Sequence, residues 1–322
     1  MKNRSVLLMQ GVAVALAVFM ASSAVSAESA RLQELRSRLE ASSGLPRRQV
    51  ARQILEFGQE ANALVLVLMQ DKDLVVRRNA HRNLRARFGD QALAYYEKAL
   101  QDGEALVRTV AVEDLIAWQP RSDQVVALLM RAAKDSDNGV RKLAGDTFWN
   151  FHRSYTTLRK RPDWDHDITV KFQQELPQSG WRFMTDPGSN GHIEKWYAAD
   201  FDDRAWHETI IGKWWHEALP EKVGQYEGVA WYRLDFIAPA APDYDYNEAV
   251  LHFQAVDEST WVWVNGQYAG ELDIGTSGWN VPFDIEVGSM LKWGGKNSIV
   301  VRVLNAAGAG GIYKPVEFQV LK

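Results

Sequence analysis

The sequence contains no cysteine among its 322 residues. Disulfide bonds, thiolate nucleophiles, thiolate zinc sites and a lipid anchor on an N-terminal cysteine are therefore excluded. The sequence also lacks a Gly-Lys-Ser/Thr phosphate loop, a Gly-x-Ser-x-Gly nucleophile elbow and a His-Glu-x-x-His zinc motif. Its seven histidines are scattered along the chain. None of these common patterns of an enzyme active site is present.

Long hydrophobic runs are absent except at the N-terminus. Lys2 and Arg4 precede an apolar run over residues 6–20, and small residues follow it as far as Ala27. This is the pattern of a secretory signal peptide, and the run is shorter than the roughly 18 apolar residues that a membrane-spanning helix needs. We therefore expect cleavage after Ala27. The mature protein is expected to be periplasmic or secreted, with no membrane span.

Tryptophan and charge are distributed unevenly along the chain. Eleven of the 13 tryptophans lie at or beyond Trp164. Residues 28–153 carry 20 Lys and Arg against 17 Asp and Glu, whereas residues 154–322 carry 15 against 24. Two compositions in one chain indicate two domains. The acidic second half does not fit a nucleic-acid partner, because Lys and Arg supply most of the affinity for phosphate backbones.

Three segments of the first half share one pattern, in which an acidic residue is followed by Val-Arg and then by alanine. The segments are residues 73–80, 104–111 and 137–144, and their Val-Arg pairs are 31 and 33 residues apart. A repeat of this length is typical of a helical solenoid. The acid favours a helix N-terminus, and the valine and alanine, four residues apart, lie on one buried face.

Apolar periodicity predicts further helices between these segments and an N-terminal cap before them. They cover residues 63–69, 92–100 and 125–132, with the cap at 32–39 and 50–57. The pattern over residues 45–153 resembles HEAT repeats, a short α-solenoid. Its arginines Arg77, Arg108 and Arg141 either line a face that binds anions or partners, or pair with acids of the same or the next repeat. We favour the pairing interpretation. The array would serve as a contact for a protein partner or as a spacer.

The second half predicts an all-β domain. After a polar connector, short strand-like runs recur between Gly, Pro, Asn and Asp, which favours a sandwich or barrel. They cover residues 181–184, 230–236, 249–255, 260–264, 283–287, 298–304 and 316–321. Alternation places Trp261 and Trp263 on one face of their strand and the valines between and after them on the other.

Several motifs of this half occur in a recognisable order. They are Phe-Asp-Asp-x-x-Trp at 201–206, Gly-x-x-Trp-Tyr-Arg at 228–233, a turn at Asn265-Gly266, a second turn at 292–297 and a segment at 310–315. This order, over residues 180–322, resembles the jelly-roll sugar-binding domain of glycoside hydrolase family 2, a galactose-binding-like fold. The resemblance implies an antiparallel β-sandwich that binds carbohydrate and breaks no bond by itself. The loop at 275–283 departs from the family pattern, so ligand contacts cannot be carried over to it.

The expected layout is multidomain, α then β. Residues 1–27 form the signal peptide, 28–153 the HEAT-like helical repeat domain, 154–170 a linker and 171–322 the jelly-roll β-sandwich.

A sugar site needs exposed aromatic faces beside hydrogen-bonding groups, and loops are the usual place for such residues. Among the loop aromatics, Trp279 beside Asn280 is the strongest ligand candidate. Trp214 and Trp215 are candidates too, although they could instead pack against the helical array. The full set of predicted ligand-binding residues is Trp214, Trp215, Tyr226, Glu227, Trp279, Asn280, Tyr313 and Lys314. Trp206, Trp231, Trp261 and Trp263 are expected in the core.

Catalysis is not expected. Glycoside hydrolysis needs two carboxylates on opposite sides of a sugar, whereas Asp257-Glu258 and Asp202-Asp203 are adjacent pairs. No cofactor is predicted, although the resemblance allows a structural calcium ion held by Asp200 and its acidic neighbours. The sequence thus predicts an exported, non-catalytic carbohydrate-binding protein with a helical scaffold for partner contact. Two alternatives stay open: an accessory subunit or relic of a family 2 glycoside hydrolase, and a purely protein-binding scaffold.

Overall fold

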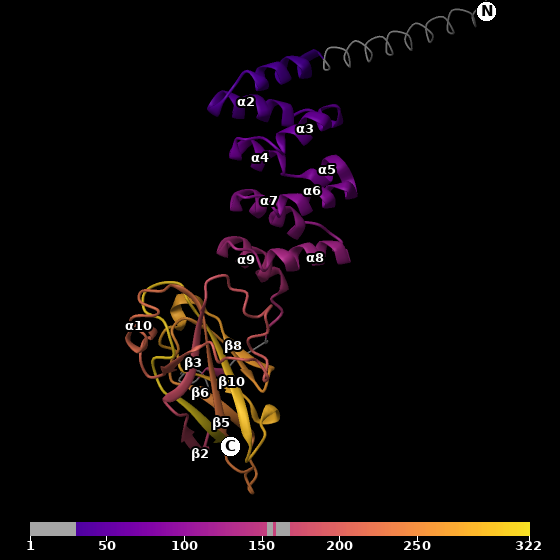
Figure 1. Ribbon diagram of the computed structural model, residues 1–322. Helices are drawn as coiled ribbons and strands as arrows, with labels where there is room; N and C mark the ends of the chain where they lie inside the picture. Colours follow the sequence, from indigo (N-terminus) through magenta and orange to yellow (C-terminus); the bar gives the residue numbers. More distant parts are fainter. Residues whose placement is uncertain (1–29, 153–156, 159–167) are drawn as a thin grey trace, which may run out of the picture. The chain divides into compact units, whose positions relative to one another are not determined.

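The computed structural model describes residues 30–152, 157–158 and 168–322. The chain forms two compact units, one extending to Ala132 and the other from Ala133 to Lys322 (Figure 1). The expected signal peptide and most of the expected linker lie outside the described residues. Over the described part of the chain, no helix has both the length and the apolar character needed to cross a membrane.

The regular structure in the described part of the first unit, residues 30–132, is all helical. A helix over residues 30–40 is followed by α2 (Gly44–Leu55), η1 (Gln59–Ala61), α3 (Asn62–Leu68), α4 (Leu74–Ala80), α5 (Leu84–Phe88), η2 (Gly89–Gln91), α6 (Ala92–Ala99), α7 (Ala105–Ile116) and α8 (Asp123–Ala132). Helix α4 contacts α2 on one side and α7 on the other, and α6 contacts α8. The helices therefore stack as an array, which agrees with the helical fold class predicted for this half.

Arginines link the repeats of this stack, and for Arg77, one of the three repeated arginines, the partner is an acid of the next repeat, as the pairing interpretation predicts. Arg47 pairs with Asp71 at 2.6 Å, and Arg77 pairs with Asp102, 25 residues further on, at 2.6 Å. The three repeated arginines also donate to backbone carbonyls six residues earlier, Arg77 to Asp71, Arg108 to Asp102 and Arg141 to Asp135. One acid of each pair thus joins its own repeat to the arginine of the repeat before it.

The second unit begins with α9 (Asn138–Gly145) and η3 (Asp146–Phe148) and continues as two antiparallel sheets. The five-stranded sheet has the order β1 (Thr157–Leu158), β9 (Phe283–Glu286), β6 (Glu248–Phe253), β11 (Val316–Leu321), β2 (Val170–Glu175). The six-stranded sheet has the order β4 (His207–Ile210), β3 (Ser179–Asp186), β5 (Gly228–Ile237), β10 (Lys296–Asn305), β7 (Ser259–Val264), β8 (Gln267–Leu272). Short helices α10 (Trp215–Ala218), η4 (Gly275–Gly278) and η5 (Gly288–Met290) lie between strands. The antiparallel β-sandwich predicted from the sequence is confirmed, and β1 lies within the expected linker.

The core of the sandwich lies between the sheets. It receives Val262 and Val264 from β7 and Val301 and Val303 from β10, whose intervening side chains point to the opposite face. On that opposite face of the six-stranded sheet, a second buried cluster holds the expected core tryptophans Trp206, Trp231, Trp261 and Trp263. All four are therefore buried, as predicted.

The chain that follows η3 covers this tryptophan face. Trp149 meets Trp261 edge to face, with ring centroids 5.5 Å apart. The buried guanidinium of Arg302 lies against both rings, 4.6 Å from the centroid of Trp149 and 4.4 Å from that of Trp261. Its burial lowers the pKa of the guanidinium to about 10. Helix α9 and Trp149, which the expected layout assigned to the helical domain, therefore belong to the same compact unit as the sandwich.

The hairpin turn between β7 and β8 lies at one end of the sandwich, and the candidate site lies among the loops at the other end. Asn265 and Gly266 have φ of 52° and 79°, the left-handed pair that a tight type I′ turn requires. At the opposite end of β7, the connections at 254–258, 273–282 and 306–315 lie together, as shown by the hydrogen bond from Asp257 N to Gly311 O at 3.0 Å. The segment before β5 joins them, because Trp215 N donates to Gly310 O at 2.9 Å.

Candidate ligand-binding site

Two aromatic rings from different loops stack at this end of the sandwich. Trp214, just before α10, lies 3.8 Å from Tyr313 between ring centroids, with the ring planes 16° apart. The hydroxyl of Tyr313 donates to the backbone carbonyl of Trp279 at 2.7 Å. Three loops that are distant in sequence are therefore joined through one tyrosine.

Polar groups surround this stack. The Lys314 ammonium donates to the side-chain carbonyl of Asn280 at 2.5 Å, and the Tyr313 hydroxyl lies 3.2 Å from the same oxygen. Trp279 is 51% exposed, and every other tryptophan that the structure describes is buried or half-buried. The arrangement offers a free indole face beside an amide and an ammonium, and both polar groups can bond a hydroxyl.

Asp257 lies buried near the stack, at 5% exposure. Its backbone N–H donates to the carbonyl of Gly311 in the 306–315 loop. Its carboxylate oxygen Oδ2 has no hydrogen-bond partner among the described residues. Burial, helped by the neighbouring charge of Glu258, raises the pKa of Asp257 to about 7. Burial and the charge of Asp257 raise the pKa of Tyr313 as well. The carboxyl is therefore poised between its neutral and ionised forms near neutral pH.

The backbone at Glu258 is held in an unusual conformation. Its φ is 63°, which non-glycine residues seldom adopt, and its carboxylate accepts the N–H of Ala306 at 2.5 Å. Close packing against the 273–282 loop fixes it further, since a Cβ on Gly278 would lie 2.3 Å from the Glu258 carbonyl oxygen. The loops at this end are thus held rigidly against one another.

The predicted ligand contact at Trp215 is wrong. Its ring is 1% exposed and belongs to the core, where it packs against Phe183 and Tyr226. The approach is so close that a Cβ on Gly310 would lie 2.1 Å from the indole. Its neighbour Trp214 is half-buried and stacks on Tyr313 instead.

Tyr226 and Glu227 lie at the margin of the cluster. The Tyr226 hydroxyl donates to the carbonyl of Val229 at 2.9 Å, and burial raises its pKa to about 12. Its ring is partly buried and packs on Trp215 at the margin of the core. Glu227 is exposed, and its carboxylate accepts the N–H of Gly308 at 3.3 Å. Of the eight predicted residues, Trp214, Trp279, Asn280, Tyr313 and Lys314 come together, and Glu227 lies at their rim.

Two of the three carboxylates considered for calcium, those of Asp202 and Asp203, are engaged in ion pairs. Asp202 pairs with Arg204 at 2.5 Å, and Asp203 pairs with the buried Arg233 at 3.1 Å. Among the described residues, no three His, Cys, Asp or Glu side chains are grouped closely enough to hold a metal ion.

Sequence reasoning did not select Asp257 for the site. It recognised the residue only as part of an adjacent acidic pair at a turn. The signal available was an acid in a loop between two apolar strands, but its burial and its unpaired oxygen depend on the 306–315 loop, which is about 50 residues away in sequence.

The fold is an antiparallel β-sandwich with a cluster of loop residues at one end. Residues 192–308 match the family model described as the Beta-galactosidase second all-beta domain. The sandwich is thus related to an all-β domain of glycoside hydrolase family 2. No curated protein sequence matches the chain.

Solved structures of two β-glucuronidases are similar over half of the chain. The enzyme of Ruminococcus gnavus has 18% identity and a TM-score of 0.41, covering 51% of this chain and 30% of that one. Its complex with D-glucuronic acid gives the same identity and score, with 51% and 31% covered. The enzyme of Lactobacillus rhamnosus has 19% identity and a TM-score of 0.40, with 51% and 30% covered. The match spans less than a third of each of these enzymes.

Proposed function

We propose that this protein is an exported, non-catalytic carbohydrate-binding protein, and that its sugar binds at the end-loop cluster of Trp214, Trp279, Asn280, Tyr313 and Lys314. The observation that supports this most is the exposed indole of Trp279, held beside Asn280 and Lys314 by rigid loops. The relation of residues 192–308 to an all-β domain of a glycosidase family supports it further.

The chemistry of the cluster suits a neutral sugar. The C–H face of a pyranose packs on an indole, and its hydroxyls bond amide, ammonium and carboxyl groups at the edge of the ring. Trp279 supplies the face in this proposal, while Asn280 and Lys314 supply the hydrogen bonds. The backbone of Asp257 bonds the loop that carries Tyr313 and Lys314, and the charge of its carboxylate acts on the Tyr313 hydroxyl.

The proposal that the site is non-catalytic rests on its carboxylates. Asp257 and Glu258 are consecutive and buried, at 5% and 4% exposure. Hydrolysis requires two carboxylates that flank the scissile bond, separated by roughly 5 to 10 Å. A pair on adjacent buried residues does not offer that arrangement.

Export rests on the N-terminal sequence. The basic residues, the apolar run and the small residues before Ala27 support secretion through a cleaved signal peptide. Expression of the full chain in a bacterium, followed by fractionation and N-terminal sequencing, tests this. Material retained uncleaved in the cytoplasm would count against it.

A second candidate function is an accessory subunit, or a relic, of a family 2 glycoside hydrolase. The family match of the sandwich favours it specifically. It predicts that aryl glycosides are hydrolysed only when a separately encoded glycosidase is present, and that the two proteins co-purify.

A glycan array probed with the full chain tests the main proposal. We expect binding of a restricted set of glycans and its loss in Trp279→Ala. Tyr244→Ala is the matched control, because Tyr244 is also exposed, at 42%, but lies in the β5–β6 connection at the other end of the sandwich. Incubating the same preparation with aryl glycosides should release no aglycone. Release by the purified chain alone would refute the non-catalytic part.

A further inference from the structure

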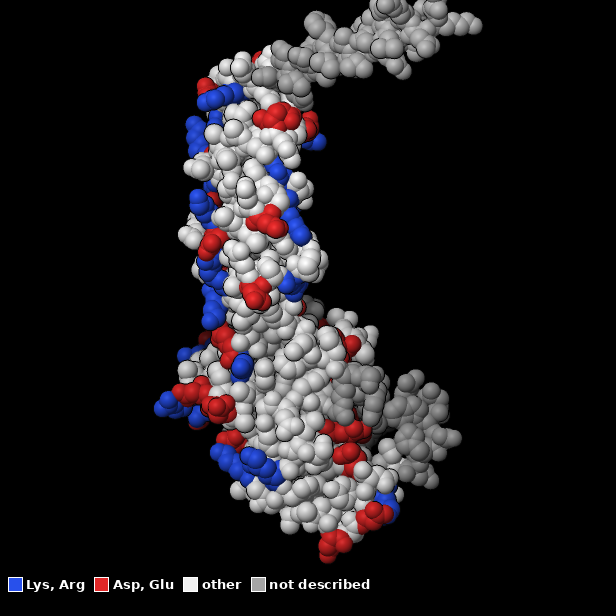
Figure 2. Space-filling view, turned by 90° about the vertical axis from the view of Figure 1, so that its right-hand side faces the viewer, with Lys and Arg blue, Asp and Glu red and all other residues white. Residues whose placement is uncertain are grey.

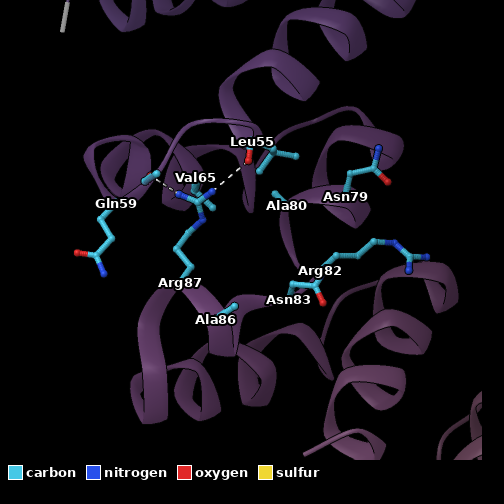
Figure 3. Close-up of a pocket in the computed structure, with 10 residues that line it drawn as sticks. Leu55, Gln59, Val65, Asn79, Ala80, Arg82, Asn83, Ala86 and Arg87 are labelled. Carbon is cyan, nitrogen blue, oxygen red and sulfur yellow. Dashed lines mark hydrogen bonds between the residues drawn. The ribbon is translucent and has the colours of Figure 1, made fainter. Parts of the chain in front are cut away.

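The helical unit contains a cavity that the proposed sugar site does not use. It has a volume of about 350 Å³ and lies between the turn after α2 and the segment that joins α4 to α5 (Figure 3). Its apolar lining comes from Leu55, Val65, Ala80 and Ala86. This size falls within the range of ligand sites and accommodates a side chain with part of its backbone.

One half-buried cation, Arg87, braces the cavity. The guanidinium of Arg87 donates to the carbonyls of Leu55 and Gly58 at 3.1 and 2.6 Å (Figure 3). It also donates to the carbonyl of Phe57 at 2.9 Å and to the amide oxygen of Asn62 at 3.1 Å. All four acceptors are neutral. The charge of Arg87 is therefore held in place by neutral oxygens, which leaves a net positive charge at the cavity wall.

Another part of the cavity lining is shaped by the strained backbone at Asn83. The helix that starts at α4 breaks after Ala80, and Asn83 adopts φ of 56° before α5 begins. This conformation is held by Asp114, which accepts the N–H of Asn83 at 2.6 Å, and by the hydroxyl of Tyr96, which accepts the N–H of Leu84 at 2.9 Å. Strain of this kind persists where surrounding contacts enforce it, and it is concentrated at functional sites.

The polar lining is rich in amides and contains no acid. Gln59, Asn79, Asn83 and Arg82 complete it, and no Asp or Glu is among the residues that line the cavity. Arg82 has one acidic contact, Glu113 at 3.4 Å, and both side chains are about half exposed. An exposed pair of this kind contributes little, so Arg82 can exchange its partner. Basic side chains also line one edge of the helical unit in Figure 2.

We propose that this cavity binds a linear peptide segment in which an acidic residue adjoins a large aliphatic one. The aliphatic side chain packs on Leu55 and Ala86, while Val65 and Ala80, at 0% and 1% exposure, lie beneath the accessible surface. The carboxylate bonds Arg82 and is attracted by the charge of Arg87, whose terminal N–H groups already donate to protein oxygens. Side-chain amides both donate and accept, so Gln59, Asn79 and Asn83 match the N–H and C=O groups of a peptide backbone. No aromatic side chain lines the cavity, so a sugar would find no flat apolar face there.

A displayed library of random linear peptides tests the proposal on the full chain. The library is panned on the wild-type protein and depleted on Ala86→Trp, which places an indole at the cavity wall. The control is Ala94→Trp, a similar change at an exposed alanine of α6 outside the cavity. Circular dichroism of both variants verifies that they are folded.

We expect the surviving peptides to carry Asp or Glu beside Leu, Ile, Val or Phe. A labelled survivor should bind Ala94→Trp like the wild type and Ala86→Trp at least about tenfold more weakly, with affinity that falls as salt rises. Survivors without acidic residues, no survivors at all, or equal binding by Ala86→Trp would overturn the proposal. Because the site lies in the other unit, this result is independent of sugar binding.

Discussion

At the scale of single residues, Asp257 combines burial with a carboxylate oxygen that has no partner among the described residues. Because its pKa is raised to about 7, the folded protein keeps the proton that the unfolded chain loses near pH 4. Folding stability is therefore expected to fall as pH rises from about 4 to about 7, and to level off above that range. The loss is at most about 4 kcal/mol.

Asp257→Asn removes this dependence. We expect the variant to be more stable than the wild type at pH 8 and equal to it at pH 4, because an amide is neutral at both values. Urea unfolding of both proteins, followed by tryptophan fluorescence at the two pH values, provides the measurement. A variant that is less stable than the wild type at pH 8 would show that the ionised carboxylate is stabilised in the fold.

Gly310 is a second residue with a sharp steric requirement. A Cβ there would lie 2.1 Å from the buried ring of Trp215, so the ring or the loop must shift. We expect Gly310→Ala to destabilise the sandwich by about 1–3 kcal/mol, as overpacking does. Gly103→Ala is the control, since a Cβ there meets nothing within 4 Å. Thermal unfolding measures both, and an unchanged melting temperature for Gly310→Ala would contradict the packing described.

At the scale of elements, the arginine pairs carry the stacking of helices in the first unit. Arg77 and Asp102 are mostly buried, with side-chain exposures of 18% and 14%, whereas Arg131 and Glu97 form a pair exposed at 46% and 47%. Removing one partner of a buried pair leaves a desolvated charge, while an exposed pair contributes little.

We therefore expect Arg77→Ala to cost about 2–4 kcal/mol and Arg131→Ala less than about 1 kcal/mol. Helix content monitored by circular dichroism during urea unfolding distinguishes them. Equal effects of the two substitutions would mean that burial of the Arg77 pair does not determine its contribution.

Sequence patterns predicted the strands that consist largely of buried β-branched and aromatic residues. Strands β5, β7, β10 and β11 are rich in β-branched and aromatic residues, and each was expected within a few residues of its observed bounds. Strand β2 was missed because its sequence is polar and its side chains are largely exposed, so no apolar alternation marks it. Helix α5 was missed because it is a five-residue helix after a left-handed asparagine.

The candidate site was predictable only in part, for a similar reason. Exposed loop aromatics such as Trp279 and Trp214 are visible in the sequence as large apolar residues among turn formers. The burial of Trp215, one residue later, depends on Gly310, and that of Asp257 depends on Gly311. Pairings between loops so distant in sequence leave no local pattern, so the sequence could not separate ligand-facing residues from core residues there.

At the scale of the whole molecule, the compact unit that contains the sandwich begins at Ala133, before α9, and not after residue 153. Trp149 and Arg302 are in ring contact, and His192 bonds the carbonyl of Gly145 at 3.0 Å. We expect a fragment of residues 133–322 to unfold at a higher temperature than a fragment of residues 154–322, because the second exposes the tryptophan face. Calorimetry of both compares them directly. Equal melting temperatures would show that the segment before residue 153 adds nothing to the sandwich.

The central claim is that the end-loop cluster holds a sugar. Isothermal titration of the full chain with the strongest glycan from the array tests it most directly, with Trp279→Ala and Tyr244→Ala titrated alongside. The account predicts saturable binding by the wild type, a loss of at least about tenfold, or ~1.4 kcal/mol, in Trp279→Ala, and unchanged binding in Tyr244→Ala. Undiminished affinity in Trp279→Ala, or no glycan binding by a folded wild-type protein, would contradict it.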